Sequence, residues 1–141
     1  MKTDIGAVFD CNVSLQAAAR QSSPSAACLR LAEGGFVHLY ISEEILTEVA
    51  DVLSRPKVRA RFPELTDKIV EEFSGQLTSV AETISDVPRR FVYQRDVDDE
   101  PYINLAVEAG AHYLVSRDKD LLDLMTGHTS ECKEFRRRFR P

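Results

Sequence analysis

The 141-residue chain has no tryptophan, few glycines and prolines (six of each), and only three cysteines. Those cysteines (Cys11, Cys28 and Cys132) form no C-x-x-C pair, which argues against a disulfide framework and against a structural zinc site. No run of about 18 apolar residues occurs, and the first residues do not resemble a signal peptide, so we expect no membrane segment. We therefore expect a protein of the reducing cytoplasm.

An excess of positive charge is also absent. The chain carries 23 acidic against 18 basic residues, a net charge of −5, which by itself argues against a nucleic-acid partner because phosphates are attracted by Lys and Arg. With 43% hydrophobic and 29% charged residues, the composition is that of an ordinary globular protein. The length predicts a single domain over residues 1–141, with a basic C-terminal tail from about residue 129.

Short apolar runs alternate with segments of helical periodicity along the whole chain. Strands are predicted at 5–9, 36–41, 79–85 and 112–116, and helices at 13–20, from Ser23-Pro24 to Gly34-Gly35, from Ser42 to Pro56, and at 63–77, 101–109 and 121–125. Ser23 and Ser42 are expected to cap the helices that follow them, and Gly110 to close the helix that starts at Pro101. Residues 87–99 are expected to form a loop. This alternation predicts an α/β fold, a three-layer α/β/α sandwich with a mostly parallel central sheet.

Acidic residues follow the predicted strands. Asp10 comes directly after the first strand, and Asp118 lies two residues beyond the strand that ends at Ser116. Asp98, Asp99 and Glu100 immediately precede the helix at Pro101. Ligands of parallel sheets bind beyond the carboxyl ends of the strands, so these carboxylates could meet at one edge. The alternative is that each Asp only caps a helix, which is a common role for Asp at such positions.

Glu48 has no such local explanation. Glu43 and Glu44 lie in the first turn after Ser42, where the helix dipole favours anions, but Glu48 is beyond the reach of that effect. It lies at the margin of the apolar face of its helix, where a solvated Glu is also common. Its functional interpretation therefore depends on the other acids.

Four motifs in order resemble those of PIN-domain nucleases. They are Val8-Phe9-Asp10-Cys11-Asn12-Val13, Ser42-Glu43-Glu44-Ile45-Leu46-Thr47-Glu48, Asp96-Val97-Asp98-Asp99-Glu100-Pro101, and Leu114-Val115-Ser116-Arg117-Asp118-Lys119-Asp120-Leu121-Leu122. The resemblance covers almost the whole chain and is closest to the VapC-like toxins of bacterial and archaeal toxin–antitoxin systems. Three departures stand out: Cys11 replaces the usual Thr, Val97 replaces Pro, and the usual apolar final strand is missing after Met125.

The resemblance implies an acidic quartet and supporting polar residues. The quartet falls on Asp10, Glu48, Asp99 and Asp118, which would also be the metal ligands. Asp98 competes with Asp99 for the third place, and Ala106 follows Asp99 at the family's usual spacing. The supporting positions are Asn12, expected to hold Asp10 in place, and Ser116, while Asp120 is either an accessory acid or a cap.

The chemistry of such a quartet is that of a metal-dependent hydrolase. Oxygen ligands without His or Cys favour Mg²⁺ or Mn²⁺ over zinc, and a carboxylate-bound metal can activate water for attack on a phosphodiester. The resemblance implies an endoribonuclease that leaves a 5′-phosphate and a 3′-hydroxyl, a cognate antitoxin protein, and a homodimer. With the quartet set aside, 19 acids remain against 18 bases, so the net charge no longer excludes an RNA substrate.

Three groups of basic residues could contact RNA. The best placed follows the Glu48 helix and consists of Arg55, Lys57, Arg59 and Arg61; the others are Arg89, Arg90 and Arg95, and Arg136, Arg137, Arg138 and Arg140. Each could also be a solvated surface. Two other functions are compatible with the residues: an aspartyl-phosphate-type phosphotransfer domain with Asp10 as nucleophile, and a catalytically inactive RNA- or protein-binding module. Asn12 disfavours a haloacid-dehalogenase-like variant of the former, which requires a second Asp there.

Overall fold

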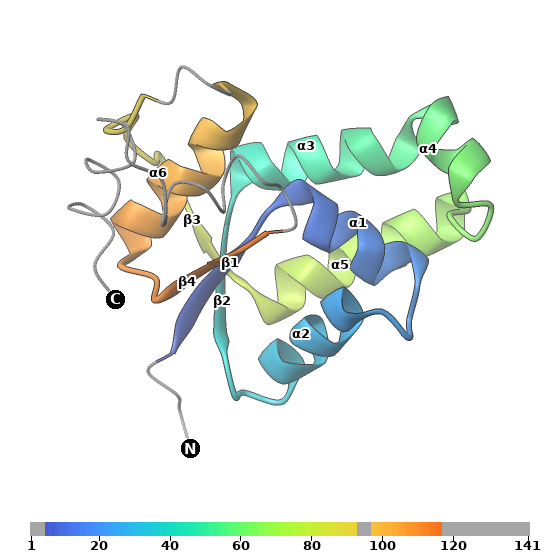
Figure 1. Cartoon of the computed structure of the whole chain (residues 1–141), viewed down its shortest axis with the longest axis horizontal. Helices are drawn as coiled ribbons and strands as arrows, with labels where there is room; N and C mark the ends of the chain where they lie inside the picture. The colour runs from blue at the N-terminus through green and yellow to red at the C-terminus, as the bar shows by residue number, and fades with distance from the viewer. Residues whose placement is uncertain (1–4, 93–96, 117–141) are drawn as a thin grey trace.

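The computed structural model describes residues 5–92 and 97–116. In this part of the chain, one parallel sheet with the strand order β3-β2-β1-β4 runs through the centre of the molecule (Figure 1). Its strands are β1 (Gly6–Phe9), β2 (His38–Ser42), β3 (Glu82–Ile84) and β4 (Tyr113–Val115). All neighbouring strands pair in parallel. The carboxyl ends of the four strands therefore lie at the same edge of the sheet.

Helices cover both faces of this sheet. They are α1 (Cys11–Ala19), α2 (Pro24–Glu33), α3 (Glu43–Ser54), α4 (Pro56–Arg61), α5 (Asp67–Val80) and α6 (Glu100–Ala109), the last preceded by a 3₁₀ turn, η1 (Val97–Asp99). Figure 1 shows α6 on one face and α1, α2 and α5 on the other, and α6 contacts β1, β2 and β4. The predicted three-layer α/β/α sandwich is therefore confirmed. No helix among the described residues combines the length and apolarity that a bilayer crossing requires.

Side-chain caps start several of these helices where the sequence indicates. Ser23 and Ser42 accept hydrogen bonds from the backbone N–H groups of Ala26 and Ile45, both at 3.1 Å, as predicted for α2 and α3. Such caps contribute about 1 kcal/mol each. The apolar faces that they orient form the core, where α3 and α6 bury side chains completely, among them Ile45, Val49, Leu53, Tyr102, Ile103 and Leu105.

Several predicted boundaries were wrong by two to four residues. The second strand begins at His38 instead of residue 36, because the Phe36 N–H bonds to the Leu31 carbonyl at 2.9 Å and so still belongs to the turn that closes α2. Helix α1 begins two residues early, since the Asp10 side chain caps it. Pro56 was expected to end a helix, and α3 does end before it, at Ser54 with Arg55 as the C-cap. The sequence did not predict α4, in which Pro56 occupies the first position, where proline is well tolerated.

The region around α5 also differs. This helix begins at Asp67 instead of residue 63, because the Thr66 hydroxyl caps it by accepting from the Ile69 N–H at 3.2 Å. It continues to Val80, so β3 starts at Glu82 instead of residue 79. The predicted helix 121–125 and the basic tail from about residue 129 lie outside the described residues.

Two glycines allow a matched stability test. Gly110 ends α6 in the left-handed region (φ 64°), whereas Gly75 lies inside α5, and a β-carbon at either position meets no atom within 4 Å. Gly110→Ala is expected to lower the free energy of unfolding by about 1 kcal/mol, because a side chain is strained at positive φ. Gly75→Ala is expected to raise it by about 0.5–1 kcal/mol. Urea unfolding measures both, and a change of the same sign in the two variants would contradict the assignment of their backbone conformations.

Candidate active site

Asp10 lies at the carboxyl edge of the sheet, between β1 and α1. Its side chain is buried (3% exposed), and its Oδ1 accepts from the Val13 N–H at 2.8 Å, which caps α1. Its Oδ2 accepts from the Ser116 hydroxyl, and its own N–H donates to the Val115 carbonyl at 3.0 Å. Because Phe9 and Val115 are register partners, β1 and β4 deliver Asp10 and Ser116 side by side. Asp10 is therefore both a helix cap and a fixed carboxylate, so the two interpretations do not exclude each other.

Glu48 lies in the second turn of α3 and is half-buried. Burial raises the pKa of its carboxyl group, and the negative charges of Asp98 and Glu44 raise it further. The nearby hydroxyl group of Tyr102 and the positive charge of Arg55 lower the pKa, without cancelling the increase. Asp98 lies in η1, which contacts α6, and α6 in turn contacts α3, so the charge of Asp98 acts on Glu48 from a distant part of the chain. A bound cation would relieve the repulsion between such carboxylates.

Tyr102 and Cys11 fill the space around Glu48. The hydroxyl group of Tyr102 is buried and makes no hydrogen bond within the described part of the chain. It lies near enough to Glu48 and Cys11 that their charges, with burial as the main cause, raise the pKa of the tyrosine. Burial, then the charges of Glu48 and Asp10, raises the pKa of the Cys11 thiol to about 11. In the metal-free protein the thiol is therefore neutral at physiological pH, and no nucleophilic chemistry is expected of it.

Asp98 and Asp99 differ in their surroundings. Asp99 is buried (8% exposed) at the N-cap position of α6, whereas Asp98 is exposed in η1 and acts electrostatically on Glu48. The burial of Asp99 favours it as the third acid of the site. The electrostatic effect of Asp98 on Glu48 favours Asp98 instead, because carboxylates that share a metal must lie close together. Both therefore stay candidates. Of the other predicted residues, Asn12 is exposed at the start of α1, and Asp118 and Asp120 lie outside the described residues.

The described residues do not assemble a complete metal site. Within residues 5–92 and 97–116, no group of three or more His, Cys, Asp or Glu side chains is arranged to hold a metal ion. What they bring together are pairs: Asp10 and Glu48 both act on Cys11, and Glu48 interacts with Asp98. All of these donors are carboxylate oxygens, which suits Mg²⁺ or Mn²⁺ and not zinc.

The basic run after α3 is partly engaged in structural contacts. Arg59 donates to the Leu53 carbonyl at 3.1 Å and to Asp67 at 2.5 Å, and so ties α4 to its neighbours. The guanidinium group of Arg61 lies over the ring of Phe62. Arg55 and Lys57 are exposed.

Within this run, Arg55 is the residue tied to the site. It pairs with Asp51 at 2.8 Å, one turn before it on α3, and its charge also acts on Glu48 and Cys11. Arg55 is thus the member of the run that lies near the carboxylates.

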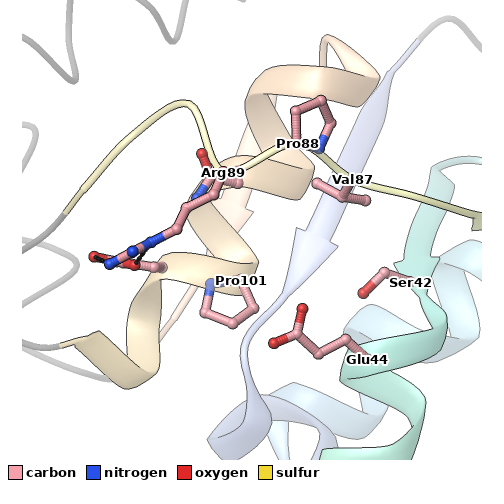
Figure 2. Close-up of a pocket in the computed structure, with 8 residues that line it drawn as sticks. Ser42, Glu44, Val87, Pro88, Arg89 and Pro101 are labelled. Carbon is pink, nitrogen blue, oxygen red and sulfur yellow. Dashed lines mark hydrogen bonds and ion pairs between the residues drawn. The ribbon is translucent and has the colours of Figure 1, made fainter.

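A cavity of about 350 Å³ adjoins the carboxylates, between the starts of α3 and α6 (Figure 2). It is lined by Ser42, Glu44, Val87, Pro88, Arg89, Glu100, Pro101 and Asn104. Sequence reasoning assigned no role to Glu100, Asn104 or Tyr102. A signal for these three residues was present in the sequence: they are polar side chains at alternate positions of α6, a helix that is otherwise mostly apolar.

These features define an α/β domain with a carboxylate-lined edge of its parallel sheet. The family model for the PIN domain matches residues 6–120, and the chain belongs to this family. PIN domains are generally nucleases, which supports a nuclease-type enzyme. No curated protein and no solved structure matches the chain.

The raised pKa of Glu48 predicts a stability effect. A carboxyl group whose pKa is raised by folding destabilises the folded state when ionised, so the penalty is present at about pH 7 and absent at about pH 4. Glu48→Gln in metal-free protein is therefore expected to raise Tm relative to the wild type at about pH 7 and to bring little change at about pH 4. The control is Glu43→Gln, in the exposed first turn of α3, which loses a favourable helix-dipole interaction and should lower Tm slightly at about pH 7. A lower Tm of Glu48→Gln at neutral pH would contradict the electrostatic description of Glu48.

Proposed function

We propose that the protein is a Mg²⁺- or Mn²⁺-dependent endoribonuclease. The observation that carries this proposal is the buried Asp10 carboxylate, oriented by Val13 and Ser116 at the sheet edge of a PIN domain and close to Glu48. Geometric constraint of this kind is what a metal ligand requires, because the angle and position of the oxygen atoms must be set before the ion binds. The substrate would be cut to leave a 5′-phosphate and a 3′-hydroxyl.

Each residue then has a defined task. Asp10, Asp99 and Asp118 would hold the metal with Glu48 as a further ligand, and the bound ion would acidify a water and stabilise charge on the phosphate. Ser116 keeps Oδ2 of Asp10 oriented through its hydroxyl group. Tyr102 lies beside the Glu48 carboxylate, whose pKa is raised by burial and by the charges of Asp98 and Glu44, and Glu48 would either bind the metal or orient the water. Asp98, Asp120 and Asn12 would act as accessory residues, and the exposed Arg55 and Lys57, with Arg59 and Arg61, would attract the RNA backbone.

The direct test is cleavage of RNA by the purified full-length chain. End-labelled RNA and a DNA strand of the same sequence are incubated with Mg²⁺, with Mn²⁺, or with EDTA. We expect RNA cleavage with either metal, at least about a hundredfold less with EDTA, and 3′-hydroxyl ends on the upstream products. Cleavage that persists in EDTA would contradict metal dependence. Cleavage of the DNA strand but not of the RNA would contradict the proposed ribonuclease activity.

We further propose that the protein is the toxin of a toxin–antitoxin pair, in the manner of the VapC-like subgroup, and acts in the cytoplasm as a homodimer restrained by an antitoxin protein. The sequence motifs support this proposal. Induced expression in a bacterial host should slow growth, and Asp10→Asn should not. Light scattering of the purified protein should give twice the mass of the 141-residue chain. Equal growth of cells that express the wild type and cells that express Asp10→Asn would contradict the proposal that the protein is a toxin.

A further inference from the structure

The cavity beside the carboxylates adjoins the site at two points. Glu44 precedes Glu48 by one helical turn, and the negative charge of Glu44 contributes to the raised pKa of Glu48. Glu100, on the opposite wall, directly follows Asp99. A molecule in the cavity would therefore lie next to whatever the carboxylates act on. The volume of the cavity, about 350 Å³, is in the range of small-ligand pockets.

One wall of the cavity is fixed by Arg89 and Glu100. The Arg89 Nε–H and Nη2–H groups donate to the two oxygens of Glu100 at 2.7 and 3.1 Å, a two-point pairing that holds the guanidinium plane still. The side chain of Glu100 is 5% exposed, whereas that of Arg89 is 63% exposed. The remaining N–H groups of Arg89 are thus presented at the rim, where they can meet the sugar–phosphate backbone of a nucleotide.

The segment that carries Arg89 is held in place by Asn104. Its side-chain oxygen accepts from the N–H groups of Arg90 (2.9 Å) and Phe91 (2.7 Å), and its amide donates to the Phe91 carbonyl at 3.0 Å. An ion pair between Arg90 and Glu108 (2.7 Å) adds a second anchor to α6. The wall is therefore formed before any ligand arrives, which lowers the entropic penalty of binding.

The opposite wall offers a hydrogen-bond acceptor. Figure 2 shows the Ser42 and Glu44 side chains directed toward Pro101, while the Arg89 side chain lies beyond Pro101 and extends away from them. The Glu44 carboxylate is exposed and has no hydrogen bond or ion pair in the part of the chain that the structure describes. Between the two walls, Val87, Pro88 and Pro101 supply apolar surfaces. A flat ring with N–H groups on one edge fits these surfaces and this acceptor.

We propose that this cavity binds a guanine base of the RNA substrate next to the scissile phosphate. A carboxylate can only accept hydrogen bonds, and guanine is the base whose Watson–Crick edge has two adjacent N–H donors. Adenine and cytosine place a ring-nitrogen acceptor beside the amino group, which the Glu44 carboxylate would repel. The base stacks on the proline rings, and Arg89 contacts the backbone at the rim. This inference rests on the proposed ribonuclease function and adds sequence selectivity to it.

Binding of mononucleotides tests the cavity without any cleavage. Metal-free full-length protein is titrated with guanosine 5′-monophosphate and with adenosine 5′-monophosphate and followed by ¹H–¹⁵N NMR. We expect guanosine monophosphate to bind more tightly and to shift the signals of Glu44 and of the Asn104 side-chain amide. Glu44→Gln should lower the guanine-over-adenine ratio by about tenfold, because a carboxamide accepts from the adenine amino group and donates to its ring nitrogen.

Glu43→Gln is the matched control, since Glu43 is an exposed first-turn residue of α3 that does not line the cavity. It should keep the wild-type ratio. Equal binding of the two nucleotides by the wild type, or the same change in both variants, would overturn the assignment of the cavity.

Sequencing of the ends released from a random RNA pool separates this inference from the function itself. Cleavage next to guanine that shifts toward adenine in Glu44→Gln supports both. Cleavage without base preference leaves the ribonuclease intact and overturns the guanine site. Guanine-selective binding without any cleavage overturns the ribonuclease and supports the cavity as a guanine site.

Discussion

Asp10→Asn should reduce RNA cleavage at least about a thousandfold while the protein stays folded. The substitution removes a negative charge and one ligand oxygen but leaves the shape of the side chain unchanged. Asn is as good a helix cap as Asp, so the hydrogen bond from the Val13 N–H to the side-chain oxygen is retained. The loss of activity would then reflect the chemistry at the carboxylate and not the loss of α1. The measurement is the initial rate of cleavage at saturating Mg²⁺ or Mn²⁺, together with Tm.

Ser116→Ala is the matched variant for this test. It removes the hydroxyl group that donates to Oδ2 of Asp10 and leaves the carboxylate in place. We expect a smaller loss of about ten- to a hundredfold, the usual effect of removing the partner that orients a metal ligand. If Asp10→Asn keeps the wild-type rate, the metal-nuclease proposal fails. If Ser116→Ala loses as much as Asp10→Asn, the hydroxyl is itself part of the reacting site.

Asn104→Ala should lower the free energy of unfolding by about 2–4 kcal/mol. The substitution removes three hydrogen bonds that join α6 to the segment at Arg90 and Phe91, and neutral hydrogen bonds of this kind contribute about 0.5–1.5 kcal/mol each. The backbone groups of Phe91 would lose these partners in a buried setting, which costs more than the bonds alone. Urea unfolding monitored by circular dichroism measures the change.

Asn104→Asp separates the two halves of this interaction. It keeps an oxygen that accepts from Arg90 and Phe91 but loses the donor to the Phe91 carbonyl. We expect the free energy of unfolding of Asn104→Asp to lie between those of the wild type and Asn104→Ala. A change below about 0.5 kcal/mol in Asn104→Ala would show that the segment is held by its other contacts, among them the Arg90–Glu108 ion pair.

Local rules were sufficient for the elements and for some of their ends. Ser23 and Ser42 were expected to cap helices and do so, and Gly110 was expected to close α6 and adopts the left-handed conformation there. Such signals depend on a residue and its neighbours along the chain, so they can be read without the fold. Pro56 shows where local rules are incomplete. They predicted the end of α3 but missed α4, because proline is common both just after one helix and at the first position of the next.

Asp10 shows a different limit. A helix cap and a buried functional carboxylate follow a strand in the same way, so no local pattern distinguishes them. The structure reveals that one oxygen serves the cap and the other accepts from Ser116, which directly follows β4 and is 106 residues away in sequence. Only the pairing of β1 with β4 creates that contact.

The sequence by itself determined the alternation of strands and helices, the parallel sheet that follows from it, and the acidic motifs of a PIN domain at the ends of its strands. Periodicity, caps and motif order are properties of short segments, so they can be recognised without knowledge of how the segments pack. Tertiary structure alone decided that Tyr102 and Cys11 lie near Glu48, that Arg89 pairs with Glu100, and that a cavity opens beside Glu44. These contacts join residues from different elements, and their distances depend on how α3 and α6 pack on the sheet.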